Sequence, residues 1–126
     1  MGILEKLLET NVDKLKEIEK VEREIPRLTK IFEEPFIVTC YPITEEQIKH
    51  VMEISKEGNT RANFVLEGCR LEGKKLSDKM VLEWLGVHSG MDAVKTLFRA
   101  GEIQGIYDVI NELSGYGDDA VKEIKN

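Results

Sequence analysis

The two histidines are the side chains of this chain with the clearest capacity for metal binding or catalysis. His50 follows Glu46 by four residues and precedes Glu53 by three, so the three side chains would share one face of a helix. Imidazole and carboxylate groups on one face can bind a divalent metal. A metal site also needs further ligands and a shaped cleft, so a solvated helix face explains this pattern better.

The second histidine lies in the turn GVHSG, where His88 adjoins Ser89 and precedes Asp92. These residue types form nucleophilic catalytic sites. Ser89 is better explained as the N-cap of a helix over residues 91–100, because a serine hydroxyl accepts hydrogen bonds from the first backbone amides of a helix. We therefore predict no catalytic residue, no metal site and no cofactor, and we expect that the protein is not an enzyme.

The remaining candidates for chemistry are two cysteines and a pair of glycines. Cys40 and Cys69 lie beside apolar residues, without a CxxC spacing or a histidine at ligand spacing, so we expect reduced thiols in the core. Gly101 and Gly105 lack the Lys-Ser/Thr pair of a phosphate-binding loop. Their helical spacing could instead let two helices approach closely.

The composition is that of one domain with a charged surface. The chain has 126 residues, 41% of them hydrophobic and 33% charged, which predicts a single domain over residues 1–126. A formal net charge of -6 and a pI near 5.0 argue against nucleic-acid binding, which requires clustered Lys and Arg. No apolar run approaches the roughly 18 residues of a spanning helix, and the N-terminus lacks a secretion signal. We expect no membrane association and a protein that stays in the compartment where it is made.

One strand and one capped helix are the clearest elements of the N-terminal half. The segment FIVTCY, residues 36–41, is rich in β-branched and aromatic residues and is bounded by prolines, which predicts a strand. Thr44 is expected to cap the next helix, with Gln47 completing a capping box. Gly58 is expected to stop this helix. The residues predicted to face inward from it are Ile48, Val51, Met52 and Ser55.

The C-terminal half reads as a series of short helices. We predict a helix over residues 60–71, then a helix capped by Ser77, and a last amphipathic helix within residues 97–116 that ends at Gly115. The helix after Ser77 is predicted to point Met80, Val81, Trp84 and Leu85 to the core. The apolar face of the last helix is predicted to consist of Ile103, Ile106, Tyr107, Ile110 and Leu113.

Two stretches of the chain resemble one protein family. The first is IPRLTKIFEEPFIVTCYPITEEQ, residues 25–47, with an Arg-Leu-Thr-Lys segment, a Pro-Phe strand and a helix start. The second runs from the Leu-Gly-Val end of a helix, through Leu-Phe-x-x-Gly-Glu at residues 97–102, to Asn-Glu-Leu-Ser-Gly-Tyr at residues 111–116. In order and spacing they are similar to the XkdN-like tail assembly chaperones of tailed bacteriophages and prophages.

The resemblance implies both a fold and a function. Residues 12–25 fit either a helical face or a strand alternation, and the resemblance favours a strand over residues 19–25 that pairs with the Pro-Phe strand. The fold expected is α+β and mostly α-helical, with a small N-terminal antiparallel β-hairpin packed against four or five short helices. Such a chaperone binds the phage tape measure protein and helps to recruit tail tube subunits. It acts in the cytoplasm of the bacterial host and is absent from the mature virion.

The residues that contact partners are expected at the apolar N-terminal segment and in the last helices. Residues 1–8 could form only a short helix, which is marginal in water without a partner surface. The expected partner-binding residues are Ile3, Leu4, Leu7, Leu8, Phe98 and Tyr107. The ends, residues 1–11 and 117–126, are expected to be mobile or to dock on a partner, and self-association of identical chains stays open. The alternatives are a small acidic helical adaptor or regulatory module that binds a host protein and, more weakly, a small hydrolase that uses His50 or His88.

Overall fold

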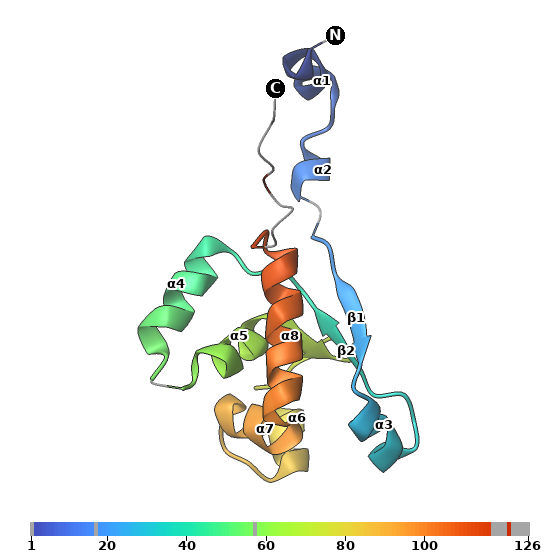
Figure 1. Cartoon of the computed structure of the whole chain (residues 1–126), viewed down its shortest axis with the longest axis vertical. Helices are drawn as coiled ribbons and strands as arrows, with labels where there is room; N and C mark the ends of the chain where they lie inside the picture. Colours follow the sequence, from blue (N-terminus) through green and yellow to red (C-terminus); the bar gives the residue numbers. More distant parts are fainter. Residues whose placement is uncertain (1, 17, 57, 117–120, 122–126) are drawn as a thin grey trace.

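The structure, a computed structural model, has the α+β architecture that the sequence predicts. It describes residues 2–16, 18–56, 58–116 and 121, and within these ranges there are eight helices and four strands (Figure 1). The elements in chain order are α1 (Ile3–Glu9), α2 (Asp13–Lys16), β1 (Val21–Glu24), α3 (Pro26–Phe32), β2 (Ile37–Cys40), α4 (Glu45–Ile54), α5 (Thr60–Gly68), β3 (Cys69–Leu71), β4 (Lys74–Lys75), α6 (Lys79–Leu85), α7 (Gly90–Leu97) and α8 (Ala100–Leu113). Apart from Val121, the predicted mobile tail lies outside the described residues.

The sheet is larger than the expected hairpin. Its four strands are antiparallel neighbours in the order β1-β2-β3-β4. β1 pairs with β2 from Val21 opposite Cys40 to Glu24 opposite Ile37, which confirms the strand favoured by the resemblance. These two strands are joined through α3 and not by a tight turn. The tight hairpin is β3–β4, where Glu72 and Gly73 both have positive φ, as a two-residue type I′ turn requires.

The helix predicted over residues 60–71 is wrong beyond Gly68. The chain leaves the helix there and continues as β3, with Cys69 opposite Cys40 of β2. The carbonyl of Gly68 accepts a hydrogen bond from the amide of Tyr41 at 2.8 Å, so pairing with β2 begins at the last helical residue. The residues from Cys69 onward, whose apolar spacing suggested that the helix continues, therefore belong to a strand.

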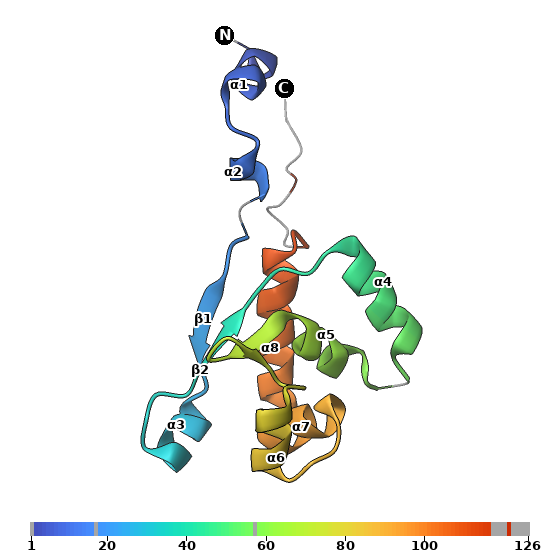
Figure 2. The same cartoon turned by 180° about the vertical axis from the view of Figure 1, so that it is seen from behind.

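The core forms where α8 packs against α5 and the sheet. α8 runs through the middle of the molecule in Figures 1 and 2, and its Ile106 and Ile110 are buried. The predicted stop at Gly115 is confirmed, because Gly115 has a φ of +91° and the amide of Tyr116 bonds back to the carbonyl of Asn111 at 3.0 Å. In the described ranges the largest fully buried side chains are Leu76, Ile110, Val38, Val51, Val65, Val94, Cys40 and Cys69.

Two of the three predicted helix caps are confirmed. The hydroxyl of Thr44 accepts from the amide of Gln47 at 3.2 Å, and the side chain of Gln47 accepts from the amide of Thr44 at 2.8 Å. Ser89 caps α7 by accepting from the amide of Asp92 at 3.1 Å. The prediction for Ser77 is wrong by one residue, since Asp78 caps α6 and accepts from the amide of Met80 at 2.9 Å.

Three residues predicted to face the core are exposed instead. Met52 on α4 and Met80 on α6 are exposed, and Trp84 on α6 is 64% exposed. Both helices cover the body with a single face, and in α6 the half-buried residues are Val81, Leu82 and Leu85. A stripe of apolar residues wider than the buried face therefore leaves large side chains in solvent.

The two cysteines are buried and free, as predicted. They are direct partners across β2 and β3, and both are fully shielded from solvent. A hydrogen bond with Cys40, together with burial, raises the pKa of the Cys69 thiol far above its usual range. This pair is part of the core.

Gly68 is required for the close approach of α5 to α8, and this gives a first prediction. A Cβ at Gly68 would lie 2.8 Å from Cδ1 of Ile110 and 3.0 Å from the carbonyl oxygen of Tyr41, whereas a Cβ at Gly105 would meet no atom within 4 Å. Gly68→Ala should lower the free energy of unfolding by about 1–3 kcal/mol through overpacking. Gly105→Ala should raise it by up to about 1 kcal/mol, because alanine favours the helix interior. Urea unfolding of both variants checks this, and equal effects of the two changes would refute it.

Candidate interaction surfaces

The structure places both histidines at the surface. His50 lies on α4 and His88 lies before α7, and both are exposed. Ser89 is engaged as the cap of α7. Among the described residues, no group of three or more His, Cys, Asp or Glu side chains is placed to hold a metal ion. The surfaces that remain to be explained are apolar.

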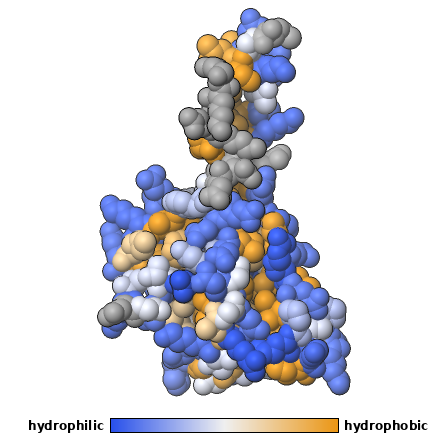
Figure 3. All heavy atoms as spheres, in the orientation of Figure 1, coloured by the Kyte–Doolittle hydropathy of each residue, from blue (hydrophilic) through white to orange (hydrophobic). Residues whose placement is uncertain are grey.

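The first apolar surface is the N-terminal arm, residues 3–16, which comprises α1 and α2. It extends away from the body in Figures 1 and 2, and α1 has no buried residue. Four of the expected partner-binding residues lie on it, and all are exposed, from 51% for Leu7 to 88% for Leu8. Apolar residues gather along this projection in Figure 3. An arm with this much apolar surface in water is typical of an interaction site.

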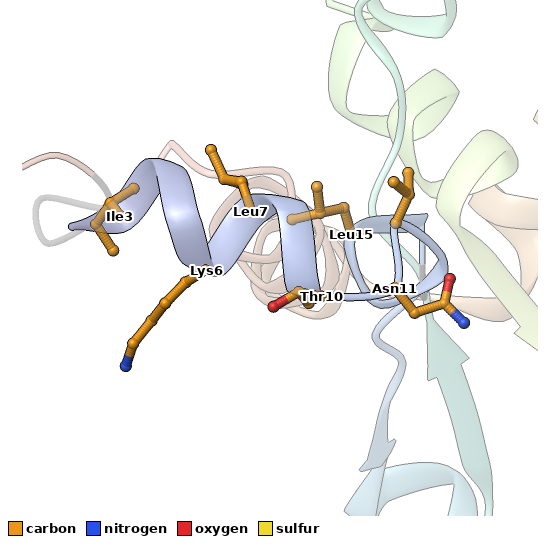
Figure 4. A pocket seen from close by; sticks show the side chains of 7 residues that line it. Ile3, Lys6, Leu7, Thr10, Asn11 and Leu15 are labelled. Atoms are coloured by element: carbon orange, nitrogen blue, oxygen red, sulfur yellow. The ribbon is translucent and has the colours of Figure 1, made fainter. Parts of the chain in front are cut away.

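The turn between α1 and α2 makes a hollow, which we name the arm cup (Figure 4). Its volume is about 140 Å³, and it is lined by Ile3, Lys6, Leu7, Thr10, Asn11, Val12 and Leu15. Leu7 and Leu15 come from the two helices to the same side, whereas the Lys6 ammonium extends away from them. Leu4 and Leu8 belong to another face of α1, so the arm offers two apolar faces.

The second apolar surface is an aromatic ridge made of Phe32, Phe36 and Trp84. The ring of Phe32 stacks on Phe36 with centroids 5.7 Å apart, and it meets the ring of Trp84 at 5.5 Å. Hollows of about 260 and 440 Å³ border the ridge, and Trp84, Leu71 and Glu72 line both of them. The single tryptophan of the chain therefore stands between two apolar hollows.

An ion pair fixes the helix that carries part of this ridge. Arg27 of α3 binds the carboxylate of Glu102 through two nitrogens, with distances of 2.8 and 3.0 Å, and donates to the carbonyl of Leu97 at 2.8 Å. Thr29 continues the connection, since its hydroxyl accepts from the amide of Phe36 at 2.9 Å. Both family-like stretches meet in these contacts, which place Phe32 and Phe36 beside α6.

The same contacts give Glu102 a pH-dependent role. The hydrogen bonds from Arg27, aided by one from the amide of Arg99 at 2.8 Å, hold the pKa of this carboxyl below its usual range. A carboxyl with a depressed pKa stabilises the fold above its unfolded value of about 4.3, and that contribution is lost as the pH falls through the folded value.

We predict that Glu102→Gln is less stable than the parent at neutral pH and that this difference shrinks below about pH 4. Urea midpoints at neutral and acidic pH measure the difference. Glu112→Gln, at an exposed position on the same helix, is the control and should match the parent at both pH values. A difference for Glu102→Gln that does not change with pH would show that charge is not the cause.

The two partner-binding residues expected in the last helices have different surroundings. Phe98 is 4% exposed and lies in the core between α7 and α8, so the expectation that it is exposed for a partner is wrong. Tyr107 is half-buried against Phe64, with ring centroids 5.0 Å apart. The guanidinium of Arg61 lies 5.9 Å from the Tyr107 ring, beside a hollow of about 280 Å³. Tyr107 therefore keeps a surface that a partner could contact.

Sequence reasoning missed the aromatic ridge and the second half of the arm cup. The apolar spacing predicts Trp84 in the core, and Phe32 and Phe36 stand in the sequence only as parts of a family-like segment. Val12 and Leu15, which are exposed, lie in the segment whose spacing fits both a helix and a strand. A signal did exist at Ile31 and Phe32, two large apolar residues followed at once by Glu33 and Glu34.

Comparisons with known proteins identify the family. The family model described as phage XkdN-like tail assembly chaperone protein matches residues 4–125 of this chain. Neither the comparison with curated proteins nor that with solved structures gave a match. No described helix is long and apolar enough to cross a membrane. The family match covers the arm as well as the body.

Proposed function

This chain belongs to the family of phage XkdN-like tail assembly chaperone proteins, and from this premise we propose that it binds the tape measure protein of a phage tail. In this proposal it keeps the tape measure protein soluble, helps to recruit tail tube subunits, and acts in the bacterial cytoplasm before the tail is complete. It dissociates during assembly and is absent from the mature virion. The function is one of binding and includes no catalytic step.

The observation that carries this proposal is the exposed N-terminal arm. A tape measure protein is a long helical chain, and its apolar stripes would aggregate unless another amphipathic surface covered them. Ile3, Leu4, Leu7 and Leu8 expose apolar surface on a short helix that no described part of the body covers. The arm therefore has the chemistry to cover an apolar helix, and Tyr107 is proposed as a further contact.

Self-association belongs to the same proposal. The arm is exposed, and so is the aromatic ridge, in which Trp84 is 64% and Phe32 is 39% exposed. Identical chains can cover such surfaces before a tape measure protein is available. We therefore propose that the chaperone exists as a self-associated form that gives way to a complex with its partner.

The test of the proposed function is co-expression with the tape measure protein of the same phage. We expect the tape measure protein in the soluble fraction and a complex of the two on size exclusion. The double variant Leu4→Asp with Leu8→Asp should lose most of this effect, whereas Glu5→Gln on the same helix should keep it. The chaperone function fails if the tape measure protein is equally soluble alone and forms no complex.

A further inference from the structure

The arm and the aromatic ridge lie at opposite ends of the molecule. In Figures 1 and 2, α1 and α2 project from one end, and α3 and α6, which carry Phe32 and Trp84, lie at the other. In this arrangement the arm of one chain does not cover the ridge of the same chain. Each surface is therefore open to another molecule over the part of the chain that the structure describes.

The two surfaces match in size. The arm cup has a volume of about 140 Å³. An apolar cavity of about 150 Å³ accommodates a benzene ring, so the cup has room for the six-membered ring of an indole. The Trp84 side chain is 64% exposed, and the two hollows that it lines leave room for side chains of a docked segment.

The charges of the two surfaces are complementary. Lys6 is the one charged residue among the described residues that line the arm cup. Among the described residues, Glu34 and Glu72 are the charged ones that line the larger hollow, and Glu72 and Lys74 are those that line the smaller one, so carboxylates outnumber ammonium groups around the ridge. A lysine whose stem lies along an apolar surface can reach a carboxylate at its edge.

We propose that the N-terminal arm of one copy docks on the aromatic ridge of a second copy, with the Trp84 ring in the arm cup and Lys6 near Glu34 and Glu72. This inference deepens the self-association proposed above by naming its two surfaces. A contact between two different surfaces is head-to-tail, so it produces a ring or an open chain of copies. The contact is at the small end of specific interfaces, and we expect association in the micromolar range.

Trp84 reports on this contact directly, because it is the only tryptophan in the chain. As the concentration of the purified protein rises, Trp84 emission should shift to shorter wavelength and its quenching by acrylamide should fall. Both changes should follow the increase in mass measured by light scattering. Protection of Trp84 at all concentrations in a monomer would instead show that the chain covers its own ridge, and the proposal would be wrong.

Two variants separate the surfaces, and a third is the matched control. Leu7→Asp should disable the arm cup, and Trp84→Ala should disable the ridge, so each variant alone should be monomeric. An equimolar mixture should form dimers, with the Trp84 emission of the Leu7→Asp chain shifted, because it still has a ridge and its partner still has an arm. Leu8→Asp, on the same helix but outside the cup, should associate like the parent.

Other outcomes identify other contacts. If Trp84→Ala associates like the parent while Leu7→Asp does not, the arms pair with each other and the ridge is not involved. A parent that stays monomeric with Trp84 exposed would also overturn the proposal. That result would leave the tape measure interaction intact as a separate question, because the Leu4 and Leu8 variants test it on another face of α1.

Discussion

Replacing Phe98 with alanine is expected to lower the free energy of unfolding by about 3–5 kcal/mol, the usual cost of truncating a buried aromatic side chain. Phe98 is 4% exposed and packs in the core beside the start of α8. Trp84→Ala should cost only about 1 kcal/mol, because the ring is 64% exposed and its main neighbour is Phe32.

Far-UV circular dichroism during urea unfolding measures both variants, since this signal does not depend on the tryptophan. The pair is informative because the sequence analysis predicts the opposite order, with Trp84 in the core and Phe98 as a partner contact. Equal losses of stability for Phe98→Ala and Trp84→Ala would contradict the packing described above.

Deleting residues 2–16 is expected to leave the thermal midpoint nearly unchanged and to abolish tape measure binding. Burying an aliphatic side chain contributes about 1.5–3 kcal/mol, so removing a segment of the core would lower the midpoint strongly. The large apolar side chains of the arm are exposed by at least half, so they add little to the stability of their own chain. The double variant Glu5→Gln with Lys14→Gln alters only charged residues of the arm and should bind normally.

One result of the deletion experiment would contradict this prediction. A large drop in midpoint, with binding and oligomeric state preserved, would place the arm in the core of its own chain. Thermal melts, light scattering and size exclusion with the tape measure protein separate these two results.

The local elements of this fold could be predicted because their signals are local. The Thr44 and Gln47 capping box, the Ser89 cap and the strand around Val38 each depend on residues within a few positions of one another. The strand at Cys69 could not be predicted in this way. It exists because Cys40, far away in the sequence, offers it a partner.

The family-like motifs have physical reasons that only the fold reveals. Arg27 and Glu102 are 75 residues apart in the sequence and form the ion pair that fixes α3. Ser114 lies in the last motif, and its hydroxyl accepts a hydrogen bond from the amide of Ile43 at 3.0 Å. Neither contact could be predicted from residue spacing, because the two residues of each pair are far apart in the sequence.

Candidate interaction residues were predictable on the arm and not on the body. Leu4 and Leu8 lie in a segment too short to form a stable helix alone, so their exposure could be predicted from the length and composition of that segment. For Trp84 and Phe98 the apolar pattern does not say which part of a helix or turn the rest of the chain covers. Phe98 turns inward where α7 ends, and α6 presents its tryptophan to solvent.

The proposed chaperone function is tested most directly by diluting purified tape measure protein from denaturant and following its aggregation by light scattering. Added parent chaperone should suppress the scattering in proportion to its amount until the tape measure protein is saturated. The Leu4→Asp with Leu8→Asp variant should fail to do so, although it keeps the fold. Equal scattering with and without the parent protein, or equal protection by this variant, would contradict the account that the exposed arm makes this protein a tail assembly chaperone.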